Sequence, residues 1–217
     1  MEKIELPGLV LRRIAVGGMD NNVYLITAGD GAQLLVDAAA EPDAIEALLD
    51  AASPDAPEPR LRYLLTTHSH HDHIGALAAV ASAHPEAEVV AGDADADAIT
   101  AGTGVRVTRR LRDGDTLVLG DLELAVIGLR GHTPGSVAVA LTPSGAPAQL
   151  VTGDSLFPGG VGNTGRDPQR FARLFADVVD RVFDRYPDDT VVWPGHGLPT
   201  TLGAERPHLA EWAARGW

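Results

Sequence analysis

Cysteine is absent from the 217 residues, which excludes disulfides, thiolate metal ligands and a cysteine nucleophile. Any bound metal must therefore be held by nitrogen and oxygen atoms. No apolar run approaches the ~20 residues that a membrane helix requires. The acidic N-terminal stretch 1–7 does not have the pattern of a secretory signal. We therefore expect a soluble, cytoplasmic protein with no membrane partner.

Basic residues are also scarce: 17 Lys and Arg stand against 30 Asp and Glu, a formal net charge of −13. Such a surface repels phosphate backbones, so nucleic acid is not expected as a partner. The length suits one domain with a sizeable core, and we predict a single domain over residues 1–217. The sequence leaves the oligomeric state open.

Hydrophobic periodicity predicts strands alternating with helices. The predicted strands are residues 23–27, 33–36, 61–67, 88–91, 117–119, 122–127, 137–141, 149–152 and 191–193. The predicted helices are residues 42–51, 74–83, 93–100 and 168–183, with a further turn near 207–213. A proline-rich loop separates the first helix from the strand after it. Because the alternation is not strict, stacked sheets covered by helices fit better than a Rossmann fold or a barrel.

The segment Thr67-His68-Ser69-His70-His71-Asp72-His73 lies between a predicted apolar strand and the next helix. Residues two apart on an extended chain share a face, so His68 and His70 can point the same way. The turn into the helix can then direct Asp72 and His73 to a neighbouring point. Imidazole and carboxylate groups suit zinc, iron or manganese. A solvated histidine cluster is the alternative, but the preceding apolar strand and the internal Asp disfavour it.

Three more possible ligands stand where later strands end, each beside glycine or proline: His132 in GHTPG, Asp154 in TGD and His196 in PGHG. Glycine lets the backbone turn sharply and approach a metal closely. Each segment alone is weak evidence. With the first cluster they give seven nitrogen or oxygen ligands, enough for two metal ions that share one carboxylate.

These motifs together resemble the metallo-β-lactamase-fold superfamily, and the GHT, GD and GHG set is similar to its glyoxalase II branch. The resemblance implies an α/β (α+β) fold, a four-layer αββα sandwich with the metals at one edge between the sheets. It implies that His68, His70 and His132 bind one metal ion. It further implies that Asp72, His73 and His196 bind the second, and that Asp154 binds both.

The expected activity is hydrolysis by a metal-activated hydroxide. Two divalent ions, most simply Zn²⁺ with Fe or Mn as alternatives, lower the pKa of a shared water from ~15.7 to near neutral. The hydroxide attacks a carbonyl, and water or Asp72 protonates the leaving group, which makes Asp72 the expected catalytic residue. The substrate class is a thioester, ester or lactone of a small molecule. The chain ends 21 residues after His196 (217 − 196), which disfavours the glutathione-binding helical extension of full-length glyoxalase II.

Substrate contacts are expected from the glycine-rich loop after Asp154, through Phe157, Asn163 and Arg166. Tyr24, in a segment similar to the family's entry into a strand, is expected to approach the same pocket. His71 is not expected to be a ligand.

Two groups of acidic residues receive different predictions. Asp37, at the end of the strand LLV, resembles a family aspartate that orients the metal loops. The acidic run Asp93, Asp95 and Asp97 is expected to be a solvated helix start.

Three other functions remain open. A mononuclear-iron, persulfide dioxygenase-like oxidoreductase would use most of the same ligands. A tRNA-processing nuclease is disfavoured by the acidic charge, and a non-catalytic metal-binding module predicts no turnover of any ester. Fold alone does not choose among them.

Overall fold

Seven strands form the first sheet of the computed structural model, which describes residues 1–216. Neighbours are antiparallel from β1 to β4 and parallel from β4 to β7. The strands, in order across the sheet, are β1 (Glu2–Leu6), β2 (Leu9–Val16), β3 (Asn21–Ala28), β4 (Ala32–Val36), β5 (Arg60–Thr66), β6 (Glu88–Gly92) and β7 (Arg109–Leu111). The last residue of the predicted domain, 217, lies outside the described residues.

A second sheet has six strands in the order β15-β14-β11-β10-β9-β8. Its members are β8 (Thr116–Leu119), β9 (Leu122–Gly128), β10 (Val137–Leu141), β11 (Gln149–Gly153), β14 (Val191–Pro194) and β15 (Thr200–Thr201). Two short strands, β12 (Leu156–Phe157) and β13 (Gly160–Val161), pair separately. Because β9 and β11 are both antiparallel to β10, and β14 is parallel to β11, the strands β9, β11 and β14 run in one direction.

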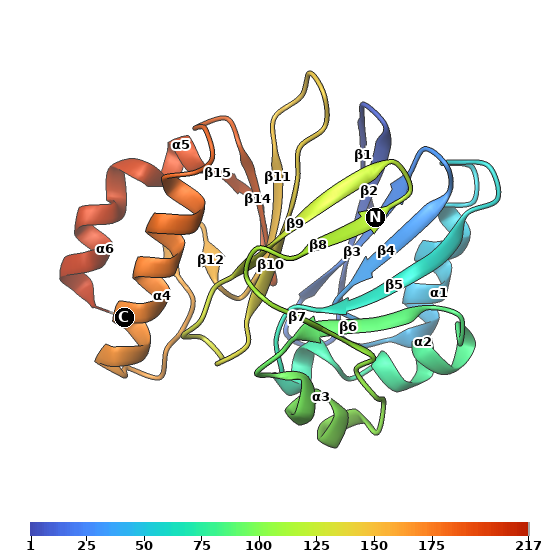
Figure 1. Ribbon diagram of the computed structural model, residues 1–217, viewed down its shortest axis with the longest axis horizontal. Helices are drawn as coiled ribbons and strands as arrows, with labels where there is room; N and C mark the ends of the chain where they lie inside the picture. Colours follow the sequence, from blue (N-terminus) through green and yellow to red (C-terminus); the bar gives the residue numbers. More distant parts are fainter. Residues whose placement is uncertain (217) are drawn as a thin grey trace.

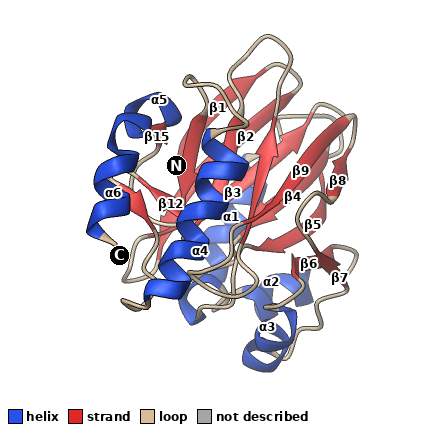
Figure 2. Cartoon of the chain, turned by 60° about the vertical axis from the view of Figure 1, so that its left-hand side comes forward, coloured by secondary structure: helices blue, strands red, loops and turns tan. Residues whose placement is uncertain are grey.

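Helices cover the outer face of each sheet (Figure 1). The helices α1 (Pro42–Ala51), α2 (Leu77–Ala83) and α3 (Ala96–Thr103) pack on the first sheet. The helices α4 (Pro168–Val178), α5 (Leu202–Glu205) and α6 (Leu209–Arg215) lie on the side of the second sheet, with α4 along its outer face (Figure 2). Within residues 1–216, none of the helices has both the length and the apolar character needed to cross a membrane.

Three hydrophobic clusters separate the layers. The strand β3 contributes side chains to two of them. Its side chains alternate: Tyr24 and Ile26 face the second sheet, whereas Val23 and Leu25 face the helices. A strand buried on both faces needs an apolar side chain at almost every position, which explains its continuous apolar sequence. The result is the αββα sandwich, so the fold expected from the sequence is confirmed.

Most predicted elements lie within a few residues of where periodicity placed them. The first residues of predicted helix 74–83 are instead part of the loop that follows a 3₁₀ turn, His71–His73, so α2 begins at Leu77. Predicted helix 93–100 lies three residues later, as α3. Predicted helix 168–183 is α4 followed by a π turn, Val179–Phe183, and Asp167 caps it by accepting hydrogen bonds from the amides of Gln169 and Arg170. The N-terminal hairpin β1–β2 and the short β7 were not predicted.

The proline-rich loop before β5 is tied to the N-terminal hairpin by a shielded ion pair. The carboxylate of Asp55 accepts hydrogen bonds from Nε and Nη2 of Arg12, at 2.5 and 2.8 Å. Lys3 lies 3.2 Å from the same carboxylate. The Asp55 side chain is inaccessible to solvent. The Arg12 guanidinium, and after it Lys3, therefore holds the pKa of Asp55 below its usual 3.8 despite the opposing effect of burial.

We expect Asp55→Asn to lower the free energy of unfolding by roughly 2–3 kcal/mol at neutral pH, because Arg12 loses its charged partner. Since the pKa of Asp55 is lower in the folded state, its contribution is complete above pH 3.8 and declines as the pH falls through the folded value. Urea unfolding at about pH 7 and pH 3 should therefore show a smaller difference from the unmodified protein at the lower pH. The exposed Asp97→Asn, which loses an ion pair with Arg110, should cost under about 1 kcal/mol. An equal loss for Asp55→Asn at both pH values would contradict this assignment.

Candidate metal centre

The seven predicted ligands lie in loops that leave the carboxyl ends of four strands. The segment from His68 to His73 follows β5, His132 follows β9, Asp154 follows β11 and His196 follows β14. Backbone hydrogen bonds join the two sheets here: the amide of Val137 donates to the carbonyl of Thr67 at 2.9 Å. The amide of Asn22 likewise donates to the carbonyl of Gly195, at 2.7 Å. The two sheets therefore fix the separation of loops that are distant in sequence.

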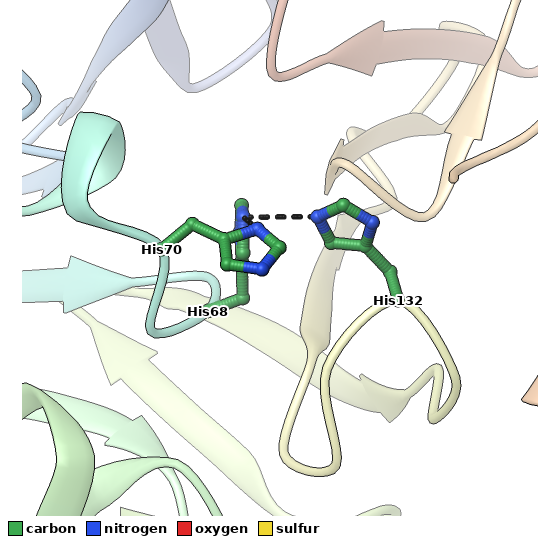
Figure 3. Close-up of side chains that lie close together, drawn as sticks. All are labelled: His68, His70 and His132. Carbon is green, nitrogen blue, oxygen red and sulfur yellow. Dashed lines mark hydrogen bonds between the residues drawn. The ribbon is translucent and has the colours of Figure 1, made fainter. Parts of the chain in front are cut away.

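Three imidazoles form a first triad (Figure 3). Nε2 of His68 lies 3.1 Å from Nδ1 of His70 and 3.2 Å from Nε2 of His132. His68 and His132 are buried, and His70 is exposed. Three ring nitrogens that converge from two loops would hold one metal ion, and a tetrahedral ion with three protein ligands would keep its fourth position for water or substrate.

Asp72, His73 and His196 form a second triad. The Nε2 atoms of His73 and His196 are 3.3 Å apart. Oδ2 of Asp72 lies 3.5 Å from the first of these atoms and 3.4 Å from the second. His71 stands in the sequence between a ligand of the first triad, His70, and a ligand of the second, Asp72. Its side chain projects into solvent and belongs to neither triad.

The carboxylate of Asp154 lies between the two triads. Its Oδ1 is 3.4 Å from Nε2 of His73, and its Oδ2 is 3.6 Å from Nε2 of both His132 and His196. Oδ1 is buried and has no hydrogen-bond partner among the described residues. A buried carboxylate oxygen without a partner is costly unless a cation compensates it. The donor set and this oxygen therefore fit two metal ions bridged by Asp154.

Glycine at position 195 makes room for this carboxylate. A Cβ atom there would lie 2.1 Å from Oδ1 of Asp154 and 2.8 Å from Cε1 of His73. Gly195 in the PGHG motif is thus needed for close packing against a ligand.

Each imidazole that presents Nε2 to the centre is oriented through its other ring nitrogen. Such contacts fix the ring and the tautomer. The Nδ1 contacts are His68 to Oγ1 of Thr67 at 3.0 Å, His73 to Oδ2 of Asp37 at 2.9 Å, His132 to the carbonyl of Asn163 at 2.7 Å and His196 to the carbonyl of Met19 at 2.9 Å.

The two triads differ in their electrostatics. Burial lowers the pKa of His68 and of His132, so these two imidazoles are neutral and ready to bind a cation. The pKa of His73 is raised, because Asp37, Asp154 and Asp72 outweigh the effect of burial. A hydrogen bond to Asp154 raises the pKa of His196 to about 9. Metal binding at the second triad must therefore displace a proton from His196 at neutral pH.

Two buried carboxylates support the ligand loops from beneath. Asp37 accepts hydrogen bonds from the amide and the hydroxyl of Thr67, both at 2.7 Å, and contacts His73. It stands in left-handed backbone, with φ of 58°. The structure thus places Asp37 where it orients the metal loop, as its sequence context indicated.

The second carboxylate, Asp95, corrects a sequence prediction. It is 1% exposed rather than solvated. It accepts hydrogen bonds from the amide of Ser69, the hydroxyl of Thr133 and the amide of Gly135. Asp95 therefore ties the His68–His73 segment to the loop of His132. Nothing in the local sequence signals this role, because its partners come from two other loops.

The four predicted substrate contacts fall into two groups. Tyr24 lies in the core between the sheets, 1% exposed, and its hydroxyl donates to the carbonyl of Pro194 at 2.6 Å. Tyr24 thus positions the strand that precedes His196 and has no surface for a substrate. Phe157, Asn163 and Arg166 line a cavity of about 410 Å³ on the loop after Asp154.

A family model described as the Metallo-beta-lactamase superfamily matches residues 16–196. A hydroxyacylglutathione hydrolase of Anaeromyxobacter dehalogenans is 38% identical over 181 residues, which are 82% of this chain and 62% of that protein. The chain spans about three fifths of the length of this relative.

Two solved structures are also similar. The di-iron-bound form of TTHA1623 is 32% identical, with a TM-score of 0.67, and the match covers 90% of this chain and 96% of that one. ETHE1 from Myxococcus xanthus is 25% identical, with a TM-score of 0.74, and the match covers 94% and 84% of the two chains.

We expect Gly195→Ala to reduce the amount of metal that copurifies with the protein, because the added methyl group displaces Asp154. The fold should persist, since the two closest atoms belong to the side chains of ligands. Metal analysis beside circular dichroism tests this expectation. Gly18→Ala is the control, because a Cβ there meets nothing within 4 Å. Full metal content in Gly195→Ala would show that metal binding does not depend on the position of Asp154.

Asp37→Ala should weaken metal binding at the second triad about 10–100-fold, because His73 loses the carboxylate that orients it. Competition with a chelator should show a larger loss of affinity at the second site than at the first, which Asp37 reaches only through Thr67 and His68. The exposed Asp121→Ala should leave both affinities unchanged. Equal weakening of both sites would mean that Asp37 acts on the fold and not on His73.

Proposed function

We propose that this chain, which belongs to the metallo-beta-lactamase superfamily, is a metal-dependent hydrolase of small-molecule thioesters, esters or lactones. The observation that carries the proposal is the unpartnered Oδ1 of Asp154, buried between two triads of ligands. One shared carboxylate between two complete triads suits a pair of divalent ions better than a single ion.

Two bound divalent ions would supply Lewis acidity and lower the pKa of water toward neutrality. We propose Zn²⁺, which imidazole and carboxylate ligands bind well, with iron or manganese as alternatives. The di-iron form of TTHA1623 shows that a similar chain can hold two iron ions. No thiolate is available to favour a softer metal.

Proton transfer and substrate contact are assigned to residues around the centre. Asp72 is the proposed proton carrier. Its Oδ2 faces the second triad and accepts a hydrogen bond from Asn21 at 2.9 Å. Despite burial, Asn21 and the neighbouring imidazoles keep the pKa of Asp72 below its usual value, so it is ionised at neutral pH and can accept a proton. Phe157, Asn163 and Arg166 are proposed as substrate contacts because they line the cavity on the loop after Asp154.

The substrate class follows from the chemistry of the centre and from the relatives. The relative in Anaeromyxobacter dehalogenans is a hydroxyacylglutathione hydrolase, whose name specifies hydrolysis of an acyl derivative of glutathione. We propose acyl transfer from a thioester, ester or lactone to water as the shared reaction. We also propose a cytoplasmic location and a small-molecule partner rather than nucleic acid or membrane.

Oxidation of a persulfide at a single iron is the second candidate. The likeness to ETHE1 from Myxococcus xanthus favours it, and the first triad is able to hold one ion alone. This candidate predicts oxygen consumption and one iron per chain. It gives no role to the bridging position of Asp154.

Asp154→Asn should lower the metal content from two ions per chain and reduce kcat/KM for thioester hydrolysis by about 100-fold or more. His68→Ala should lose a first-triad ligand with a similar effect. A panel of thioesters, lactones, phosphodiesters and β-lactams, with metal analysis and an oxygen electrode, provides the measurement. Asp121→Asn, on an exposed turn, is the control. One iron per chain with persulfide-dependent oxygen uptake would overturn the hydrolase assignment.

A further inference from the structure

A second and larger cavity, of about 730 Å³, opens beside the first triad. His70 and His132 form part of its wall, so a molecule in it lies beside two ligands of the first triad. The opposite wall comes from the first turns of α4, through Gln169, Arg170 and Arg173. Its volume lies in the usual range for a small-molecule pocket.

The charge of this wall is opposite in sign to the net charge of the protein. Three arginines line the cavity and no Asp or Glu does, although the chain carries a net charge of −13. The three arginines differ in how their charge is compensated. Arg130 forms a bidentate ion pair with Asp177, with hydrogen bonds of 2.9 and 2.8 Å, so its positive charge is neutralised.

Arg170 and Arg173 are not neutralised in this way. The guanidinium of Arg170 donates to the carbonyls of Gly131 and His132, which fixes it against the His132 loop without cancelling its charge. Arg173 lies one turn further along α4 and is exposed. Among the described residues it has no hydrogen-bond or ion-pair partner.

We propose that this cavity binds the carboxylate of an anionic substrate, with Arg173 as the residue that contacts it and Arg170 as a fixed positive charge beside it. The inference rests on the proposed function, because it specifies the substrate class for the same centre. A guanidinium suits a carboxylate because its donors form a planar fork. Another cavity with arginines, Arg166 and Arg215, lies on the loop after Asp154, but no residue of either triad lines it.

The test compares three thioesters that differ in where a carboxylate stands. S-acetyl mercaptopropionate carries it on the leaving group, S-succinyl mercaptoethanol carries it on the acyl group and S-acetyl mercaptoethanol has none. For the unmodified protein, kcat/KM should favour at least one charged thioester over the neutral one. Arg173→Gln should reduce that preference about 5–10-fold, mainly through KM. Added salt should reduce the preference in the unmodified protein and have less effect on the variant.

Arg106→Gln is the matched control, since Arg106 is also exposed but does not line the cavity. It should leave the preference unchanged. An unchanged preference in Arg173→Gln, or a neutral thioester favoured by the unmodified protein, would overturn the inference.

Failure of the proposed function gives a different result, namely no turnover of any of the three thioesters. Calorimetric binding of propylthiopropionate, an unreactive thioether with the same carboxylate, then tests the cavity by itself. Tighter binding to the unmodified protein than to Arg173→Gln would support the carboxylate site. Equal affinity, or no binding to either protein, would overturn it.

Discussion

Five imidazoles and two carboxylates direct their inner atoms at one another across 3.1 to 3.6 Å. These atoms are mostly acceptors and do not satisfy one another without a cation or a proton. The protein must therefore hold them together by other means. It does so with hydrogen bonds to the outer ring nitrogens and with loops anchored at the ends of strands from both sheets. The fold can be understood as the support for this arrangement.

Buried carboxylates and close-packed glycines provide much of that support. Asp37 joins the end of β4 to the loop after β5, and Asp95 joins the same loop to that of His132. Gly195 lets Asp154 approach the second triad. Because Asp37 and Gly195 contact ligands directly, their substitution should affect metal binding more than overall stability. The Arg12–Asp55 pair, distant from these loops, contributes to stability alone.

The charge beside the first triad differs in sign from the net charge of the protein. Acidic residues dominate the chain as a whole, yet the cavity beside His70 and His132 presents arginines. Under the proposed binding mode, an anionic substrate is attracted to the arginines on the side of the first triad. Because many chemistries share one scaffold, the fold alone does not set the substrate.

The sequence by itself determined the chemistry of the ligands, since HxHxDH, GHT, GD and GHG are local motifs that end apolar strands. It also determined most strands and helices, because burial on one or two faces leaves a period in the sequence. Only the tertiary structure decided what each buried side chain faces. Periodicity marks Tyr24 and Asp95 as part of elements, but their partners come from β14 and from two separate loops. The arginine wall likewise arises where α4 meets the loop after β9, a contact that no local pattern encodes.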